Sequence, residues 1–106
     1  MTKNIFKKTL KFKKKKITIN IESYFFKNKN NIIFFGNPVY KNLDEINQTN
    51  VKEKIKDING YYLILIISKH NIIFYNDVLG NFRLYFTHTN NDNLVVSNKY
   101  SFFLKK

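Results

Sequence analysis

The clearest pattern along the chain is the alternation of apolar and polar residues in ITINIE, residues 17–22. This period of two is typical of a strand with one buried and one solvated face. The turn residues of KNKNN separate it from the apolar run IIFF at 32–35. We therefore expect a hairpin between the two strands, with Gly36, Asn37 and Pro38 ending the second.

The segment before this strand is rich in lysine. Residues 1–16 contain eight lysines and no acid, with Phe6, Leu10 and Phe12 interspersed among them. This pattern fits either an edge strand that its lysines protect from aggregation or a loosely held basic arm. We assign residues 1–16 to such an arm or edge strand and residues 17–106 to a single domain.

The middle of the chain combines a helical and a strand pattern. Residues 39–49 are polar and indicate a loop, after which Asn50 and Glu53 have the spacing of a capping box. Val51, Ile55 and Ile58 would share one helix face, with Gly60 at the helix end. The run YYLILII, residues 61–67, is apolar throughout, which predicts a central strand covered on both sides.

The last third predicts further short strands. SKHN forms a turn into IIFY, and FRLYFT, the turn HTNNDN and LVV give two more strands. Ser97 or Asn98 would cap a short final helix carrying Tyr100, Phe102, Phe103 and Leu104. The pattern as a whole predicts six or seven strands, mostly in hairpins, and two short helices, which is an antiparallel α+β fold.

Composition narrows the class of protein. The 106 residues are 43% hydrophobic and 17% aromatic, enough for one packed core. No apolar run approaches the roughly 20 residues of a membrane span, and lysines stand where a signal peptide needs an apolar segment. We expect a cytoplasmic protein. Since the chain has no cysteine, disulfides, thiolate metal sites and a thiol nucleophile are excluded.

The net charge of +12 is concentrated at the start of the chain. Residues 1–16 carry +8, residues 17–60 carry +1, and residues 61–106 carry +3. Only one of the nineteen basic residues is arginine, the side chain best suited to gripping phosphate. The run Lys11, Lys13, Lys14, Lys15 and Lys16 is a candidate contact for nucleic acid or another anion, or simply a solvated surface.

The stretch NDVLGNFR, residues 76–83, has the residues of a structured loop. Asp77 can accept backbone N–H bonds in a turn, Gly80 can adopt a positive φ, and Arg83 can reach back to acids or carbonyls. This is ordinary loop chemistry when considered alone.

With its surroundings, this stretch resembles the end of the glutaminase (class II amidotransferase) domain of asparagine synthetase-like proteins. The resemblance covers Ile58 to Leu104, about 47 residues. A glycine turn leads into YYLILII, a second strand ends in NDVLG, and LYF and LVVSNKYSFFL follow in the family's order. FFGNPVYKNL, at 34–43, is faintly similar to a further family segment. The matching residues are Gly60, Asn76, Asp77, Gly80, Leu84, Tyr85 and Ser97.

The resemblance implies a reduced, Ntn-hydrolase-like scaffold without the family's usual chemistry. The family's nucleophile is an N-terminal cysteine, which this chain lacks. The family's arginine clamp and substrate-holding segments have no convincing counterpart, and with the sequence ending at Lys106 we expect no synthetase domain. We therefore expect neither glutaminase nor ligase activity, no cofactor and no metal.

Other candidate residues have both a functional and a plain interpretation. Removal of Met1 would leave Thr2 with a free amine, as in N-terminal nucleophile hydrolases, but threonine is also a common second residue. His70 and His88 fall in predicted turns, and two histidines do not make a metal site. Asp44 and Glu45 form a carboxylate pair that an exposed loop explains equally well.

A cluster of aromatic residues is expected to lie mostly in the core. Exposure of several together would instead mark an interface. The cluster consists of Tyr24, Phe25, Phe26, Phe34 and Phe35.

These observations favour a non-catalytic, amidotransferase-like accessory domain. The resemblance implies a partner, a separate asparagine synthetase-like, ATP-dependent amide ligase; a homo-oligomer is also open. The alternative is a basic nucleic-acid-binding module that acts through the lysine-rich segment. A third hypothesis is a small hydrolase that uses Thr2.

Overall fold

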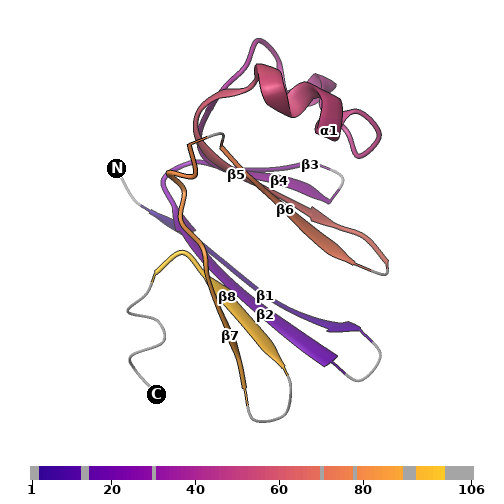
Figure 1. Cartoon of the computed structure of the whole chain (residues 1–106), viewed down its shortest axis with the longest axis vertical. Helices are drawn as coiled ribbons and strands as arrows, with labels where there is room; N and C mark the ends of the chain where they lie inside the picture. The colour runs from indigo at the N-terminus through magenta and orange to yellow at the C-terminus, as the bar shows by residue number, and fades with distance from the viewer. Residues whose placement is uncertain are drawn as a thin grey trace. The chain divides into compact units, whose positions relative to one another are not determined.

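The computed structural model describes residues 3–12, 15–29, 31–69, 71–77, 79–89 and 93–99. Over these residues the expected α+β class is confirmed, with eight strands in two mostly antiparallel sheets and one short α-helix (Figure 1). No helix in the described part of the chain is long and apolar enough to cross a membrane. The elements are β1 (Asn4–Phe12), β2 (Lys15–Ser23), β3 (Phe26–Lys29), β4 (Ile32–Val39), η1 (Leu43–Glu45), α1 (Val51–Lys54), η2 (Ile55–Asp57), β5 (Asn59–Ile67), β6 (Ile72–Asn76), β7 (Tyr85–His88) and β8 (Leu94–Ser97).

The chain divides into two compact units. The inserted unit is the continuous segment 24–82, which contains the sheet β3-β4-β5-β6 and the helical segments. The flanking unit combines residues 1–23 with 83–106 and contains the sheet β1-β2-β8-β7.

In the inserted unit, β5 is the central strand that the sequence predicts. It pairs antiparallel with β4 on one side and with β6 on the other. Tyr62 to Ile66 are all buried, and because successive side chains point to opposite faces, both faces of β5 are covered. One face packs with the helical segments (Figure 1) into a core of Ile32, Phe34, Ile46, Val51, Ile58, Tyr62, Ile64 and Ile66.

The expected end of β4 at Gly36 and Pro38 is wrong, since the strand continues to Val39. β3 pairs only with residues 32–35, so β4 is an edge strand at Pro38, where a proline is tolerated. Gly36 has a φ of +92°, and a Cβ there would lie 2.5 Å from the carbonyl oxygen of Tyr61. The strand therefore continues through Gly36, because glycine tolerates both this φ and this close contact.

The helix at residue 51 begins as expected, but its capping is different. The Asn50 side chain accepts a bond from the backbone N–H of Asn47 and donates to the carbonyl of Glu45. It makes no cap bond to the helix, so the capping box is not formed. The α-helix lasts one turn and tightens into η2, and Gly60 lies inside β5 instead of ending the helix.

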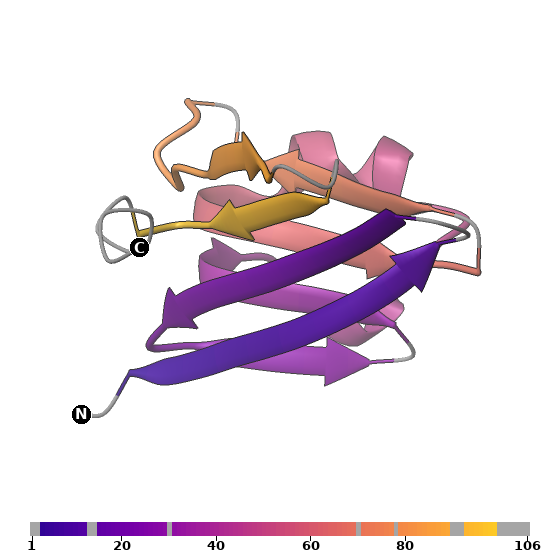
Figure 2. The same ribbon diagram turned by 90° about the horizontal axis from the view of Figure 1, so that it is seen from below.

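The pairing of the first two strands also differs from the prediction. β2 pairs antiparallel with β1 and parallel with β8, not with the apolar run at 32–35 (Figure 2). The predicted KNKNN turn is mostly strand, because Lys27 to Lys29 belong to β3 and pair with β4. Asn31, with a φ of 68°, lies between these two strands. Of the two alternatives for the lysine-rich segment, residues 4–12 form the edge strand.

The end of the described chain is joined to β2 by a side chain. The amide of Asn98 accepts a bond from the N–H of Glu22 (2.9 Å) and donates one to its carbonyl (2.7 Å). β7 begins at Tyr85, later than the predicted start at Phe82, because Phe82 is buried and hydrogen-bonded in the preceding loop. The predicted final helix lies outside the described residues.

Candidate functional site

The loop after β6 is organised by the carboxylate of Asp77. Its Oδ2 accepts the backbone N–H groups of Tyr62 (3.2 Å) and Phe82 (3.0 Å), and its Oδ1 accepts that of Asn81 (2.8 Å). The first bond links the loop to the central strand, and the other two hold the chain as it leaves the loop. The expectation that Asp77 accepts backbone bonds is confirmed.

The ionisation of Asp77 follows from these contacts. Burial alone would raise the pKa of the carboxyl, but the N–H bonds from Asn81, Tyr62 and Phe82 outweigh it. The pKa of Asp77 is therefore lower than its ordinary value, because the bonds stabilise the charged form.

Further hydrogen bonds within the loop also hold it closed. Gly80 has the expected positive φ (65°), and its N–H donates to the carbonyl of Asp77 at 2.9 Å. The side chain of Asn76 donates to the carbonyl of Phe82. Arg83 is exposed, and among the described residues it makes no ion pair, so its expected reach back to acids is not observed.

The residues that carry the family resemblance are divided between the two units. Gly60, Asn76, Asp77 and Gly80 belong to the inserted unit, whereas Leu84, Tyr85 and Ser97 belong to the flanking unit. Ser97 is fully buried, and its Oγ accepts the N–H of Lys99 at 3.0 Å. The resolved side-chain contacts of Asn76, Asp77 and Ser97 are therefore to backbone groups, which is a structural role.

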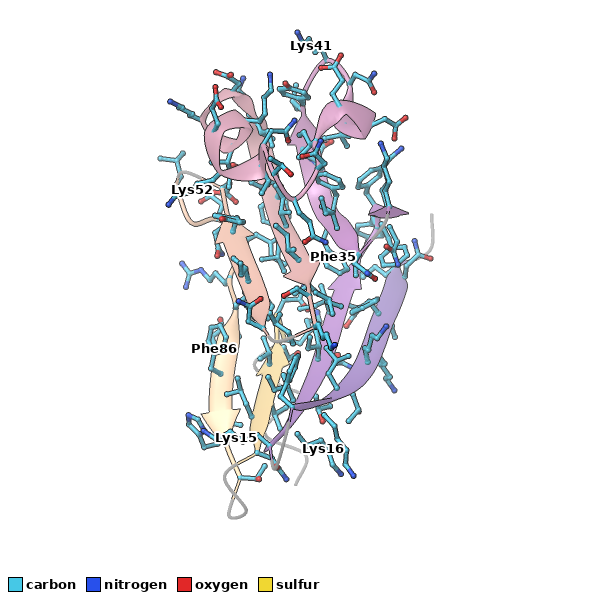
Figure 3. The ribbon with its side chains drawn as sticks, turned by 90° about the vertical axis from the view of Figure 1, so that its right-hand side faces the viewer. Lys15, Lys16, Phe35, Lys41, Lys52 and Phe86 are labelled. Atoms are coloured by element: carbon cyan, nitrogen blue, oxygen red, sulfur yellow. The ribbon has the colours of Figure 1, made fainter. Side chains whose placement is uncertain are left out.

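The lysine-rich segment forms the β1–β2 hairpin. Lys11 lies directly opposite Lys16, and Phe12 lies opposite Lys15. Lys15 and Lys16 are exposed (Figure 3), and so is Lys11. Lys13 and Lys14 lie outside the described residues.

The remaining candidate residues belong to different parts of the chain. Asp44 and Glu45 are exposed in η1, and Asp44 pairs with Lys27 at 2.9 Å. The hydrogen bond and charge of Lys27 lower the pKa of Asp44. His88 ends β7 instead of lying in a turn, since the β7–β8 pairing extends to it. Thr2 and His70 lie outside the described residues, which contain no group of three or more potential metal ligands.

The aromatic cluster is only partly core. Phe34 and Phe35 are buried, but Tyr24, Phe25 and Phe26 are 56%, 38% and 38% exposed. This corrects the expectation for these three residues. They follow the end of β2, and only Phe26 enters the short edge strand β3.

Phe26 is one end of an aromatic row in the inserted unit, consisting of Phe26, Phe35, Phe82 and Tyr61. The ring centroids of consecutive members lie 5.6, 6.5 and 5.0 Å apart. The inner two rings are buried, and the outer two are exposed. Sequence reasoning missed Tyr61, although the period of two places it on the same face as Leu63.

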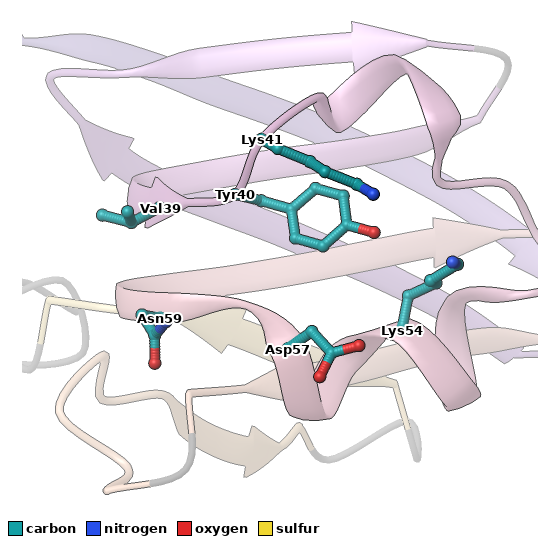
Figure 4. Close-up of a pocket in the computed structure, with 6 residues that line it drawn as sticks. All are labelled: Val39, Tyr40, Lys41, Lys54, Asp57 and Asn59. Carbon is teal, nitrogen blue, oxygen red and sulfur yellow. The ribbon is translucent and has the colours of Figure 1, made fainter.

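A pocket of about 560 Å³ opens between the end of β4 and the helical segment (Figure 4). Tyr40 and Lys41 line one side, and Lys54 and Asp57 line the other. Val39 and Asn59 complete it. The pocket was not predicted, because its residues come together only when β4 pairs with β5.

Comparison with known protein families, with curated proteins and with solved structures found no match.

Proposed function

We propose that this chain is a non-catalytic accessory domain that docks a separate asparagine synthetase-like, ATP-dependent amide ligase. The resemblance over residues 58–104 supports the class of partner. The structural roles of Asn76, Asp77 and Ser97 support a retained scaffold, because their resolved contacts hold backbone in place.

The observation that carries the proposal is the aromatic row. Its outer rings, Phe26 and Tyr61, are 38% and 45% exposed. The two residues share one face of the sheet, because Phe26 pairs with Phe35, Phe35 pairs with Leu63, and Tyr61 is two residues from Leu63. Exposed apolar side chains on one face are typical of protein interfaces, and aromatic anchors supply much of the binding energy there.

The outer rings of the aromatic row are preorganised by contacts within the protein. Phe26 contacts the buried ring of Phe35, and Tyr61 contacts the buried ring of Phe82. Phe82 is fixed in turn by its N–H bond to Asp77. Anchors held in this way lose little conformational freedom on docking, which favours affinity.

The test measures binding to a purified ligase of this class encoded beside the chain. We expect binding by the unaltered chain and at least a roughly tenfold weaker affinity for the double variant Phe26→Ser and Tyr61→Ser. Phe86→Ser is the matched control, because Phe86 is 53% exposed but belongs to β7 in the other unit (Figure 3).

Circular dichroism and thermal unfolding of each variant separate lost docking from lost folding. Absence of any binding by the unaltered chain would refute the proposed partner. Equal losses for the Phe86 control and the double variant would refute the proposed surface.

A further inference from the structure

The charge of the protein is divided unevenly between its two units. The flanking unit contains twelve basic and two acidic residues, a net charge of +10, and the inserted unit contains seven and five, a net charge of +2. Eight of the twelve basic residues belong to residues 3–16. An excess of positive charge gathered on one part of a surface favours polyanionic partners.

Strand geometry orders part of this charge into a ladder, which we define as Lys7, Lys11 and Lys16. Alternate residues of a strand share a face, and so do residues paired across a sheet. Lys7 and Lys11 are both on β1, and Lys16 lies opposite Lys11. The three side chains are exposed.

Between the lysines the same face carries small hydrogen-bonding groups. Thr9 pairs with Thr18, and Lys7 pairs with Asn20. These four residues, of which Asn20 is buried, border a hollow of about 260 Å³ together with Lys8 and Ile19, which alternate onto the other face. Phe6 and Phe12, by contrast, alternate onto the other face of β1.

The acidic residues that the structure describes do not pair with the ladder. Over the residues that the structure describes, none of its three lysines makes an ion pair, and Glu22 is instead 3.8 Å from Lys3. Two like charges directly opposite each other destabilise a strand pair. The arrangement therefore lowers the stability of the hairpin while keeping its ammonium groups available.

We propose that the ladder binds the phosphate backbone of duplex nucleic acid without reading its sequence. Lys7 and Lys11 are separated by about 13 Å along the strand, or about four base-pair steps of a duplex. Ammonium and hydroxyl groups are suitable donors to phosphate oxygens.

The other polyanions fit this face less well. Stacking on unpaired bases requires aromatic rings, and the ladder face of the hairpin carries none, because Phe6 and Phe12 are on its opposite face. Tyr85 is on the ladder face of the sheet but on β7, two strands away from β2. Anchoring in an anionic membrane requires several apolar side chains among the lysines. This face of the hairpin has one exposed apolar side chain, Ile5, beside Lys7 and none between Lys7 and Lys11. An acidic protein surface would not offer charges at a constant repeat.

The experiment measures the anisotropy of a labelled mixed-sequence duplex of about 20 base pairs, as DNA and as RNA. The ladder variant is Lys7→Gln, Lys11→Gln and Lys16→Gln. Its control, Lys52→Gln, Lys56→Gln and Lys69→Gln, removes the same charge from exposed residues of the other unit.

We expect duplex affinity to fall roughly 40-fold between about 50 and about 200 mM salt, as three phosphate contacts require. The ladder variant should lose about one unit of the salt slope for each lysine removed, and the control should retain the slope. The affinities of DNA and RNA duplexes should not depend on base sequence.

Equal losses in the two triple variants would overturn the proposal, because net charge alone would then explain binding. Tighter binding to single-stranded nucleic acid, to phosphatidylserine vesicles or to a polyglutamate peptide than to the duplex would also overturn the proposal. Circular dichroism checks the fold of each variant. The result is independent of the proposed docking function, since the ladder variant retains Phe26 and Tyr61.

Discussion

At the scale of single residues, Asp77 is the side chain on which the fold depends most visibly. One carboxylate satisfies three backbone N–H groups, from Tyr62, Asn81 and Phe82. Buried N–H groups that lose their partner are costly. Asp77 therefore determines the conformation of the loop and, through Phe82, the backing of the aromatic row.

Replacement of Asp77 by alanine should lower the free energy of unfolding by about 3 kcal/mol, because several N–H groups lose their acceptor. Asp77→Asn retains one acceptor oxygen and should have a smaller effect, about 1–2 kcal/mol. Urea unfolding followed by circular dichroism measures both. Equal stability of the alanine variant and the unaltered chain would show that water replaces the carboxylate.

The same variants have a pH signature. Because the pKa of Asp77 is lower in the folded than in the unfolded chain, its contribution is complete above the unfolded value of about 4 and is lost as pH falls through the folded value. Acid should therefore destabilise the unaltered chain more than the Asp77→Asn variant. If the free energy of unfolding fell equally with pH in the unaltered chain and in Asp77→Asn, the role assigned to the Asp77 carboxylate would be contradicted.

At this scale the sequence predicts only what is local. Asp77 and Gly80 behave as their residue types suggest, because a short polar side chain and a glycine act on neighbouring backbone. The Asn50 cap is wrong because Asn47 and Glu45 compete for the same amide. Arg83 was expected to reach acids or carbonyls, but it is exposed, and the donors to Asp77 are backbone N–H groups.

At the scale of elements, the Lys11 and Lys16 pair gives a prediction about the β1–β2 hairpin. Lys16→Gln removes a like-charge contact and should stabilise the fold by about 0.2–1 kcal/mol. Lys7→Gln is the control, since Lys7 lies opposite the neutral Asn20.

Chemical unfolding at low salt measures the difference between the two variants. If the ladder binds duplexes, Lys16→Gln should also weaken that binding, so that stability and affinity move in opposite directions. An unchanged or lower stability of Lys16→Gln relative to Lys7→Gln would show that the facing charges do not repel measurably.

The sequence predicts where several strands lie but not which strands pair with one another. The alternation in residues 17–22 predicts β2 itself, and the continuous apolar run predicts the central position of β5. Pairing is decided by residues distant in the chain. Lys16 donates its N–H to Asn93, 77 positions away, and no local pattern encodes the parallel contact of β2 with β8.

At the scale of the whole molecule, a net charge of +12 opposes compaction. Salt screens repulsion between exposed charges, so the unfolding temperature should rise between about 20 and about 200 mM sodium chloride. Differential scanning calorimetry measures the shift. A falling unfolding temperature would indicate that favourable ion pairs, such as Lys27 with Asp44, outweigh the repulsion.

The division into units was not anticipated from the sequence. Charge counted along the chain places the excess in residues 1–16, but only the pairing of β2 with β8 assigns residues 83–106 to the same unit. The aromatic row likewise requires Phe82 and Tyr61 to meet across a loop. Both candidate surfaces therefore depend on tertiary structure.

The insertion of one unit within the other has a consequence for biosynthesis. Residues 24–82 leave the ribosome as an uninterrupted segment and can complete their sheet at once. The hairpin of residues 4–23 emerges earlier, yet it acquires its third strand only when residues 94–97 have been translated. Until then β2 presents an unpaired, isoleucine-rich border in a nascent chain, the kind of border that associates wrongly with other polypeptides.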